Sequence, residues 1–134
     1  MMKNRSELRE IIMKVLYQIS IYEEASVDYN KEDIIHELIE VENSFVEDTV
    51  NGILENEKNI KKLANKYLNN WKIDRLNKVD QAILEIGIYE LMYTDTPSVV
   101  SINEAIELSK KYSEEAVTKM INGVLDKVYH EEIK

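Results

Sequence analysis

Residues 75–93, RLNKVDQAILEIGIYELMY, form the most apolar stretch of this 134-residue chain, and they decide its fold. Apolar side chains recur there every three or four positions, which is the period of an α-helix. The small and apolar residues of the stretch are Leu76, Val79, Ile83, Leu84, Ile86, Gly87, Ile88 and Leu91. We predict a central helix over residues 75–93, with Asp74 as its N-cap and Pro97 ending the unit.

The segments on either side of the central helix follow the same period. Ser101 and Glu104 have the spacing of a capping box, which predicts that a helix begins at Ser101. Ser113 is then expected to open the last helix. Ser44 and Glu47 repeat the capping-box spacing before another apolar run. The remaining helical segments are residues 5–22, 34–39 and 58–69. We therefore predict an all-α fold of about seven helices.

Composition favours one helical domain. Three Gly and one Pro are too few for a loop-rich or many-stranded fold, and 134 residues are typical of a single domain. The chain has no Cys, which excludes disulfides, thiolate metal sites and a cysteine nucleophile. No apolar run approaches the roughly 20 residues of a membrane span, and the polar N-terminus has no signal-peptide region. We expect a single domain, residues 1–134, located in the cytoplasm and not in a membrane.

Charge is unevenly distributed along the chain, whose net charge is −9. Residues 1–22 carry four basic and two acidic residues, and residues 58–78 carry seven basic and one. Residues 23–57 carry twelve acidic residues and a single basic one. The two basic islands are either chance clusters on a solvated surface or sites that contact phosphate while the acidic remainder attracts a basic protein. The cluster Lys58, Lys61, Lys62 and Lys66 is expected to be a solvated helix face.

Two segments with an Asn-Gly pair resemble each other, VNGILE at residues 50–55 and INGVLD at residues 121–126. Asn-Gly often marks a β-hairpin, but the flanks of both pairs have helical period, so we expect helices. Glycine inside a helix costs about 1 kcal/mol relative to alanine. At Gly87 this cost indicates either that another backbone packs closely or that the glycine is simply tolerated. The small residues of the two Asn-Gly pairs would let helices cross closely. The similarity indicates either two related helical bundles, one in each half, or a coincidence between two amphipathic helices.

The residues give little support for an enzyme. His36 and His130 are the two histidines, and neither has metal-ligand spacing with a second His or Cys. The chain contains neither a phosphate-binding glycine motif nor a nucleophile elbow. A catalytic site built from two carboxylates, one acting as acid and one as base, needs no local sequence motif, so the sequence does not exclude such a site. We expect a protein that is not an enzyme and has no cofactor and no metal.

Aromatic residues could stack on RNA bases, because single-stranded RNA is often held on aromatic faces. Tyr67, Tyr89 and Tyr112 fall at apolar-face spacing, and we expect them in the core. Tyr17 and Tyr22 lie on the basic first helix, where they can be exposed.

Three segments together resemble the NusB family of transcription antitermination factors. The first is Val15-Leu16-Tyr17-Gln18, preceded by Arg5 and Arg9. The second is the central run from Val79 to Leu91. The third is Pro97 followed by SINEAIELSK at residues 101–110 and INGVLD at residues 121–126. Trp71 also lies where the family often has a tryptophan, so the resemblance spans nearly the whole chain.

The resemblance implies a fold and a function. The fold is two small helical bundles packed across each other, about residues 1–70 and 71–134. Family members bind the boxA element of nascent RNA together with NusE, a small-subunit ribosomal protein. The complex joins the RNA polymerase antitermination complex, notably during ribosomal RNA synthesis.

The resemblance also implies site residues. RNA contacts are expected from Lys3, Arg5, Arg9 and Lys119. Ser6 and Glu7 are found where further arginines are common in the family. Residues at the partner or RNA interface are Tyr17, Asp80 and Met120, the last at a position that is aromatic in many members.

A sequence pI near 4.8 is low for a stand-alone RNA binder. Because phosphate contacts drive RNA affinity, we hypothesise that the protein reads RNA well only as a heterodimer with the basic ribosomal protein. The alternatives are a NusB-like adaptor in ribosomal RNA maturation, or a protein-interaction module without autonomous RNA binding. The sequence leaves the oligomeric state open, a homodimer included.

Overall fold

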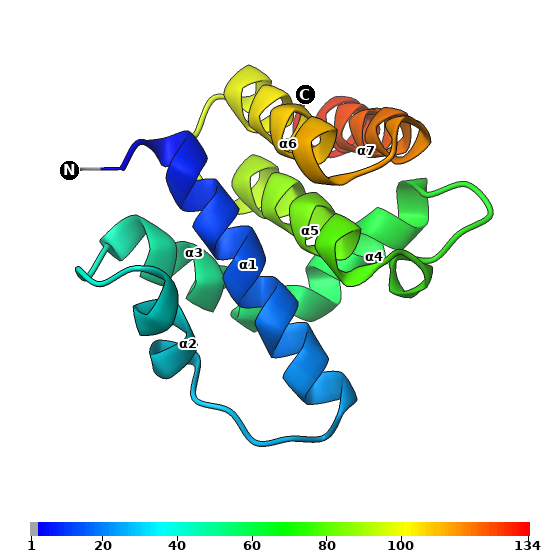
Figure 1. The fold of residues 1–134 in the computed structure, drawn as a ribbon. Helices are drawn as coiled ribbons and strands as arrows, with labels where there is room; N and C mark the ends of the chain where they lie inside the picture. The colour runs from blue at the N-terminus through cyan, green and yellow to red at the C-terminus, as the bar shows by residue number, and fades with distance from the viewer. Residues whose placement is uncertain (1–2) are drawn as a thin grey trace.

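The computed structural model describes residues 3–134, which form seven α-helices and no strand (Figure 1). The helices are α1 (Arg5–Glu24), α2 (Lys31–Leu38), α3 (Ser44–Glu55), α4 (Glu57–Tyr67), α5 (Lys78–Tyr93), α6 (Ser98–Tyr112) and α7 (Glu115–Val128). A 3₁₀ turn, η1 (Ile73–Arg75), precedes α5, and a π-helical turn, η2 (Tyr129–Ile133), follows α7. The predicted all-α fold is confirmed. None of the helices in residues 3–134 is long and apolar enough to cross a membrane.

Helix α5 is the central element, as its apolar sequence predicts. It contacts α1, α3 and α4 as well as α6 and α7, and Ile83, Leu84 and Ile88 on it are fully buried. Figure 1 shows α1, α2 and α3 on one flank of α5, with α6 and α7 on the other. The buried apolar side chains of both halves form one continuous core. The division near residue 70 therefore stays a prediction, and the core is shared across it.

Asparagine side chains cap four of the helices. Asn4, Asn30, Asn43 and Asn77 each accept a hydrogen bond from the backbone N–H three residues later, at the starts of α1, α2, α3 and α5. These caps satisfy amides that have no partner within the helix. The predicted N-cap Asp74 is wrong, because Asp74 lies in η1 and α5 begins only at Lys78. The predicted cap Ser44 is also one residue late.

The predicted starts of the last two helices are wrong as well. Helix α6 begins at Ser98, directly after Pro97, so Ser101 lies inside its first turn and is buried. Ser113 ends α6, and Glu114 is the N-cap of α7. Capping-box spacing misleads here because a serine within a first turn can have the same spacing as a cap.

Both Asn-Gly pairs are helical, in α3 and α7, so the prediction that they form no hairpin is confirmed. A Cβ on Gly52 would lie 2.1 Å from the hydroxyl oxygen of Tyr89. A Cβ on Gly87 would lie 2.8 Å from a methyl group of Leu125, so a side chain, and not the expected backbone, packs there. Nothing lies within 4 Å of a Cβ at Gly123, where the predicted close crossing is wrong.

Alanine at Gly52 and at Gly123 should have opposite effects. Gly123→Ala should raise the free energy of unfolding by about 0.5–1 kcal/mol, because it removes the cost of a helical glycine in open space. Gly52→Ala should lower it by about 1 kcal/mol or more, because the new methyl group displaces the Tyr89 ring. Urea denaturation of both variants measures the difference. Equal effects at the two positions would show that the Tyr89 contact carries no packing constraint.

Candidate nucleic-acid and partner interface

Arg9 is buried and joins α1 to α5 and α6. Its side chain is 5% exposed, and two of its nitrogens lie 2.6 and 2.9 Å from the carboxylate oxygens of Glu90. A third nitrogen lies 3.4 Å from Glu104. Ser101 donates to Glu90 at 3.2 Å, and Ser6 donates to Glu104 at 2.6 Å. A bidentate guanidinium–carboxylate pair fixes both position and orientation, so this network sets how α1 lies on α5 and α6.

Among residues 3–9, the exposed cations are Lys3 and Arg5. The Arg5 guanidinium lies 4.0 Å from the centre of the Phe45 ring, a cation–π contact with α3. Glu7, which the sequence places among the expected phosphate contacts, accepts a hydrogen bond from the Asn4 backbone N–H at 3.0 Å. Glu7 and Asn4 together form a capping box. The carboxylate of Glu7 is therefore engaged in closing the start of α1.

Tyr17 and Asp80 lie at the junction of α1, α5 and α6. Tyr17 is 40% exposed and lines a surface hollow together with Val79 and Tyr112. Asp80 is buried and accepts a hydrogen bond from the Ser113 hydroxyl. Tyr112 was expected in the core but is 38% exposed, so that expectation is wrong. Tyr17 is exposed, as predicted, and so is Tyr22.

A second polar contact ties α1 to α6 beside this hollow. Lys111 donates to both oxygens of Glu10, at 2.8 and 2.9 Å, and the Tyr112 hydroxyl also donates to Glu10. These hydrogen bonds from Lys111 and Tyr112 lower the pKa of the Glu10 carboxyl. Glu10 therefore remains ionised at neutral pH and orients the Tyr112 ring at the edge of the hollow.

Lys119 and Met120 lie on α7. Lys119 is exposed and lies 3.6 Å from Glu115 one turn earlier. Met120 is half-buried and packs against the core. Arg5 and Tyr17 are twelve residues apart on α1, which corresponds to about 18 Å along a helix. The structure therefore brings Tyr17 and Asp80 into one neighbourhood, and places Lys3 and Arg5 towards the other end of α1.

Sequence reasoning missed the partners of these residues, above all Glu90 and Glu10. Arg9 and Glu90 are 81 positions apart, so no local spacing connects them. One signal was present for Glu90, because it is a charged residue within the most apolar helix of the chain, and buried charges in proteins are normally paired.

Breaking the Arg9–Glu90 pair should destabilise the fold strongly. Arg9→Met leaves the Glu90 carboxylate buried without its partner, so the free energy of unfolding should fall by about 3–5 kcal/mol. Arg5→Ala is the matched control and should cost at most about 1 kcal/mol, the worth of an exposed cation–π contact. Urea denaturation gives both values. A double variant, Arg9→Met with Glu90→Leu, should recover much of the loss, and no recovery would contradict a paired role for Arg9.

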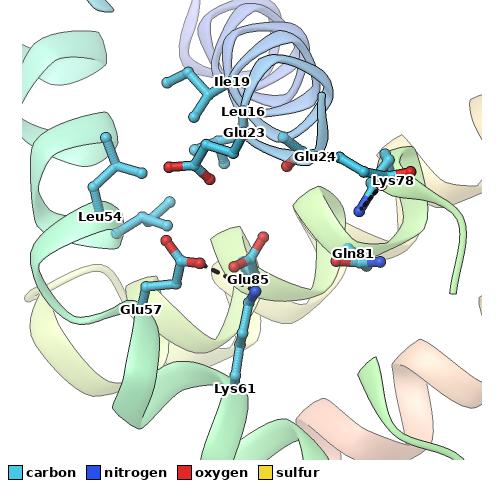
Figure 2. A pocket seen from close by; sticks show the side chains of 12 residues that line it. Leu16, Ile19, Glu23, Glu24, Leu54, Glu57, Lys61, Lys78, Gln81 and Glu85 are labelled. Atoms are coloured by element: carbon cyan, nitrogen blue, oxygen red, sulfur yellow. Dashed lines mark ion pairs between the residues drawn. The ribbon is translucent and has the colours of Figure 1, made fainter. Parts of the chain in front are cut away.

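An acidic pocket lies on another part of the surface, between α1, α3, α4 and α5. It has a volume of about 300 Å³. Figure 2 shows the carboxylates of Glu23, Glu57 and Glu85 directed into it. Lys61 also lines the pocket, and lies 3.1 Å from Glu57 and 3.6 Å from Asp74.

Glu85 is the deepest of these carboxylates, with 7% of its surface exposed. Burial is the main reason that the pKa of Glu85 is raised to about 7; Lys61 opposes this rise, and Glu57, Asp74 and Glu23 add to it. The pKa in the folded state therefore lies above the ordinary value of 4.5. Between these two values the folded protein holds more protons than the unfolded chain, so Glu85 makes the protein less stable as the pH rises.

Glu85→Gln should remove this pH dependence. The contribution of Glu85 to the free energy of unfolding should decrease by about 3 kcal/mol as the pH rises from 4.5 to 7, and glutamine has no proton to lose. The stability gained by the variant over the original protein should therefore grow from pH 5 to pH 8 in urea denaturation. Glu131→Gln, at an exposed position, should show a constant difference. Parallel pH profiles for Glu85→Gln and the original protein would contradict an elevated pKa.

The fold and these contacts define an all-helical protein in which most of the helices pack against the buried helix α5. The sequence matches the NusB family over residues 6–130. It is 39% identical over 129 residues to the transcription antitermination protein NusB of Listeria innocua, covering 96% of this chain and 98% of that protein. The chain therefore belongs to the NusB family.

Solved structures agree with this assignment. T. maritima NusB superposes with a TM-score of 0.85 at 32% identity, covering 100% of this chain and 96% of the other. A second similar chain comes from the crystal structure of antitermination factors NusB and NusE in complex with dsRNA. Its TM-score is 0.81 at 25% identity, covering 97% of this chain and 98% of the other.

Proposed function

We propose that this protein is a cytoplasmic transcription antitermination factor that binds boxA-type single-stranded RNA together with a NusE-type small-subunit ribosomal protein. The observation that carries the proposal is the similarity, over nearly the whole chain, to a NusB chain crystallised with NusE and RNA. In this role the protein takes part in the RNA polymerase antitermination complex and supports ribosomal RNA transcription. It acts by binding, without a catalytic step.

Lys3, Arg5 and Lys119 are the cations that we propose for RNA contact, because all three are exposed. Arg9 acts differently in this proposal. Its guanidinium is occupied by Glu90 and holds α1 in place, so it positions Arg5 and Lys3. Three exposed cations on a chain of net charge −9 supply few phosphate contacts. A basic partner would supply the rest, which supports RNA binding as a heterodimer.

Tyr17, Asp80 and Met120 are the residues that we propose at the partner or RNA interface. Tyr17 offers an exposed aromatic face beside a hollow, and aromatic residues are enriched at protein interfaces. Asp80 is buried near this hollow and accepts a hydrogen bond from the Ser113 hydroxyl. We assign Asp80 the role of holding the junction between α6 and α7 against α5 while Tyr17 makes the contact.

One observation favours a second candidate. With Arg9 buried, the N-terminal region has only Lys3 and Arg5 as exposed cations among the described residues before Glu10. This arrangement suits a protein-interaction module without autonomous RNA binding, such as an adaptor in ribosomal RNA maturation.

RNA titration with and without the ribosomal partner separates the two candidates. Labelled boxA RNA should bind the heterodimer at least about tenfold more tightly than this protein alone, because the partner adds phosphate contacts. Arg5→Ala and Lys119→Ala should each weaken binding by the heterodimer and reduce the slope of log K against log salt by about one. Lys127→Ala is the charge-matched control on α7 and should leave the slope unchanged.

Two outcomes would count against the proposal. Equal RNA affinity with and without the partner would remove the heterodimer requirement. An absence of RNA binding by the complete heterodimer would favour the adaptor.

A further inference from the structure

Glu85 is a buried carboxylate without a partner, and it faces a cavity. Only 7% of its surface is exposed. No hydrogen bond and no ion pair within 4 Å joins its carboxylate to another of the residues 3–134, and its oxygens reach solvent only through the pocket. Lys61 is the positive charge that acts on it. Buried charges in proteins are normally paired or hydrogen-bonded. Because the carboxylate lines the pocket between α1, α3, α4 and α5, the group that would pair with it can enter from solvent.

The lysines of the pocket are engaged elsewhere. Lys61 pairs with Glu57 and Asp74. Lys78 lies 2.8 Å from Glu24 at another point of the rim. Four carboxylates and two ammonium groups line the pocket, which leaves it with a net negative charge. Its ionic character therefore favours a cation, with Glu85 as the deepest anchor.

The apolar side chains that line the pocket also favour one kind of cation. Leu16, Ile19, Ile53 and Leu54 line the pocket alongside the carboxylates. Apolar walls between charged groups suit a chain of methylene groups that carries a charge at each end. A volume of about 300 Å³ is at the lower limit of small-molecule sites, which range over about 300–1,000 Å³. Both features fit a short aliphatic diamine better than a planar or bulky cation.

We propose that this pocket binds a small aliphatic diamine or polyamine, with one ammonium group paired to Glu85 and the methylene chain against Leu16 and Ile19. The second ammonium group lies beside the carboxylate of Glu23 on α1, because Glu24 is already paired with Lys78. The site is independent of the proposed function, since none of the residues that we assign to RNA or partner contact lines it. A bound diamine would link α1 to α5 without changing the fold.

Protonation of the Glu85 carboxylate should make the affinity for a diamine depend on pH. The charged groups that face Glu85 are Glu23 on α1, Glu57 and Lys61 on α4, and Asp74 on η1. Burial raises the pKa of Glu85 to about 7, so the carboxylate is mostly protonated at pH 6 and mostly ionised at pH 8. A diamine pairs with the ionised form, and its affinity should therefore be about tenfold higher at pH 8 than at pH 6.

Isothermal titration of the full-length protein with putrescine, the four-carbon diamine, tests the proposal. Saturable binding of one putrescine per chain is expected at pH 8, with an affinity about tenfold lower at pH 6. Glu85→Gln keeps the shape of the side chain and removes its charge, so it should weaken binding by about tenfold or more at pH 8. Glu131→Gln removes one exposed charge outside the pocket and should change the affinity by less than about twofold. Circular dichroism establishes that both variants are folded.

Three results would overturn the proposal. The first is the absence of saturable putrescine binding at millimolar concentration by the folded protein. The second is equal weakening by Glu85→Gln and Glu131→Gln, which would indicate attraction to the overall negative charge only. The third is equal affinity of putrescine and n-butylammonium, since a monoamine lacks the second charge that Glu23 is proposed to bind.

Discussion

The arrangement of the helices depends on a buried ion pair between Arg9 and Glu90. Taking both charges out of water is costly, and the cost is offset only when geometry and further hydrogen bonds are favourable. Two short contacts, with a hydroxyl of α6 donating to the same carboxylate, meet that condition. An apolar contact between α1 and α5 would tolerate sliding and rotation, whereas a bidentate pair allows one orientation. The direction in which α1 presents Arg5 and Tyr17 follows from this pair.

The charges of the chain consequently divide into two groups. Arg9, Glu90 and Asp80 are used inside the molecule, and Glu10 holds Lys111 and Tyr112 at the edge of the hollow. The remaining exposed charges are mostly acidic, which suits a protein that associates with a basic partner. The N-terminal region therefore offers fewer free cations than its composition indicates, because Arg9 is paired inside the molecule.

Much of the fold could be predicted from the sequence because helical period is a local property. The apolar run at residues 75–93 identified the central helix, and the flanks of the Asn-Gly pairs identified helices where the pair alone indicates a turn. Helix starts were less predictable, since Asn43 and Ser44 are both good caps and only the backbone decides between them. Gly87 shows the same limit. A glycine inside a helix indicates that another part of the chain packs closely against it, but the atoms that do so belong to Leu125, 38 positions away in the sequence. For the candidate site, the exposure of Tyr17 was predicted, while the pairing of Arg9 required knowledge of which helices meet.

The asparagine caps have a consequence for behaviour in acid. Aspartate at an N-cap loses its charge and part of its capping strength when it is protonated, so helices that start on aspartate loosen at low pH. An asparagine amide does not titrate in this range. The starts of α1, α2, α3 and α5 should therefore keep their hydrogen bonds in acid even as the ion pairs between helices are lost. Acid should separate these helices from one another before it unwinds their first turns.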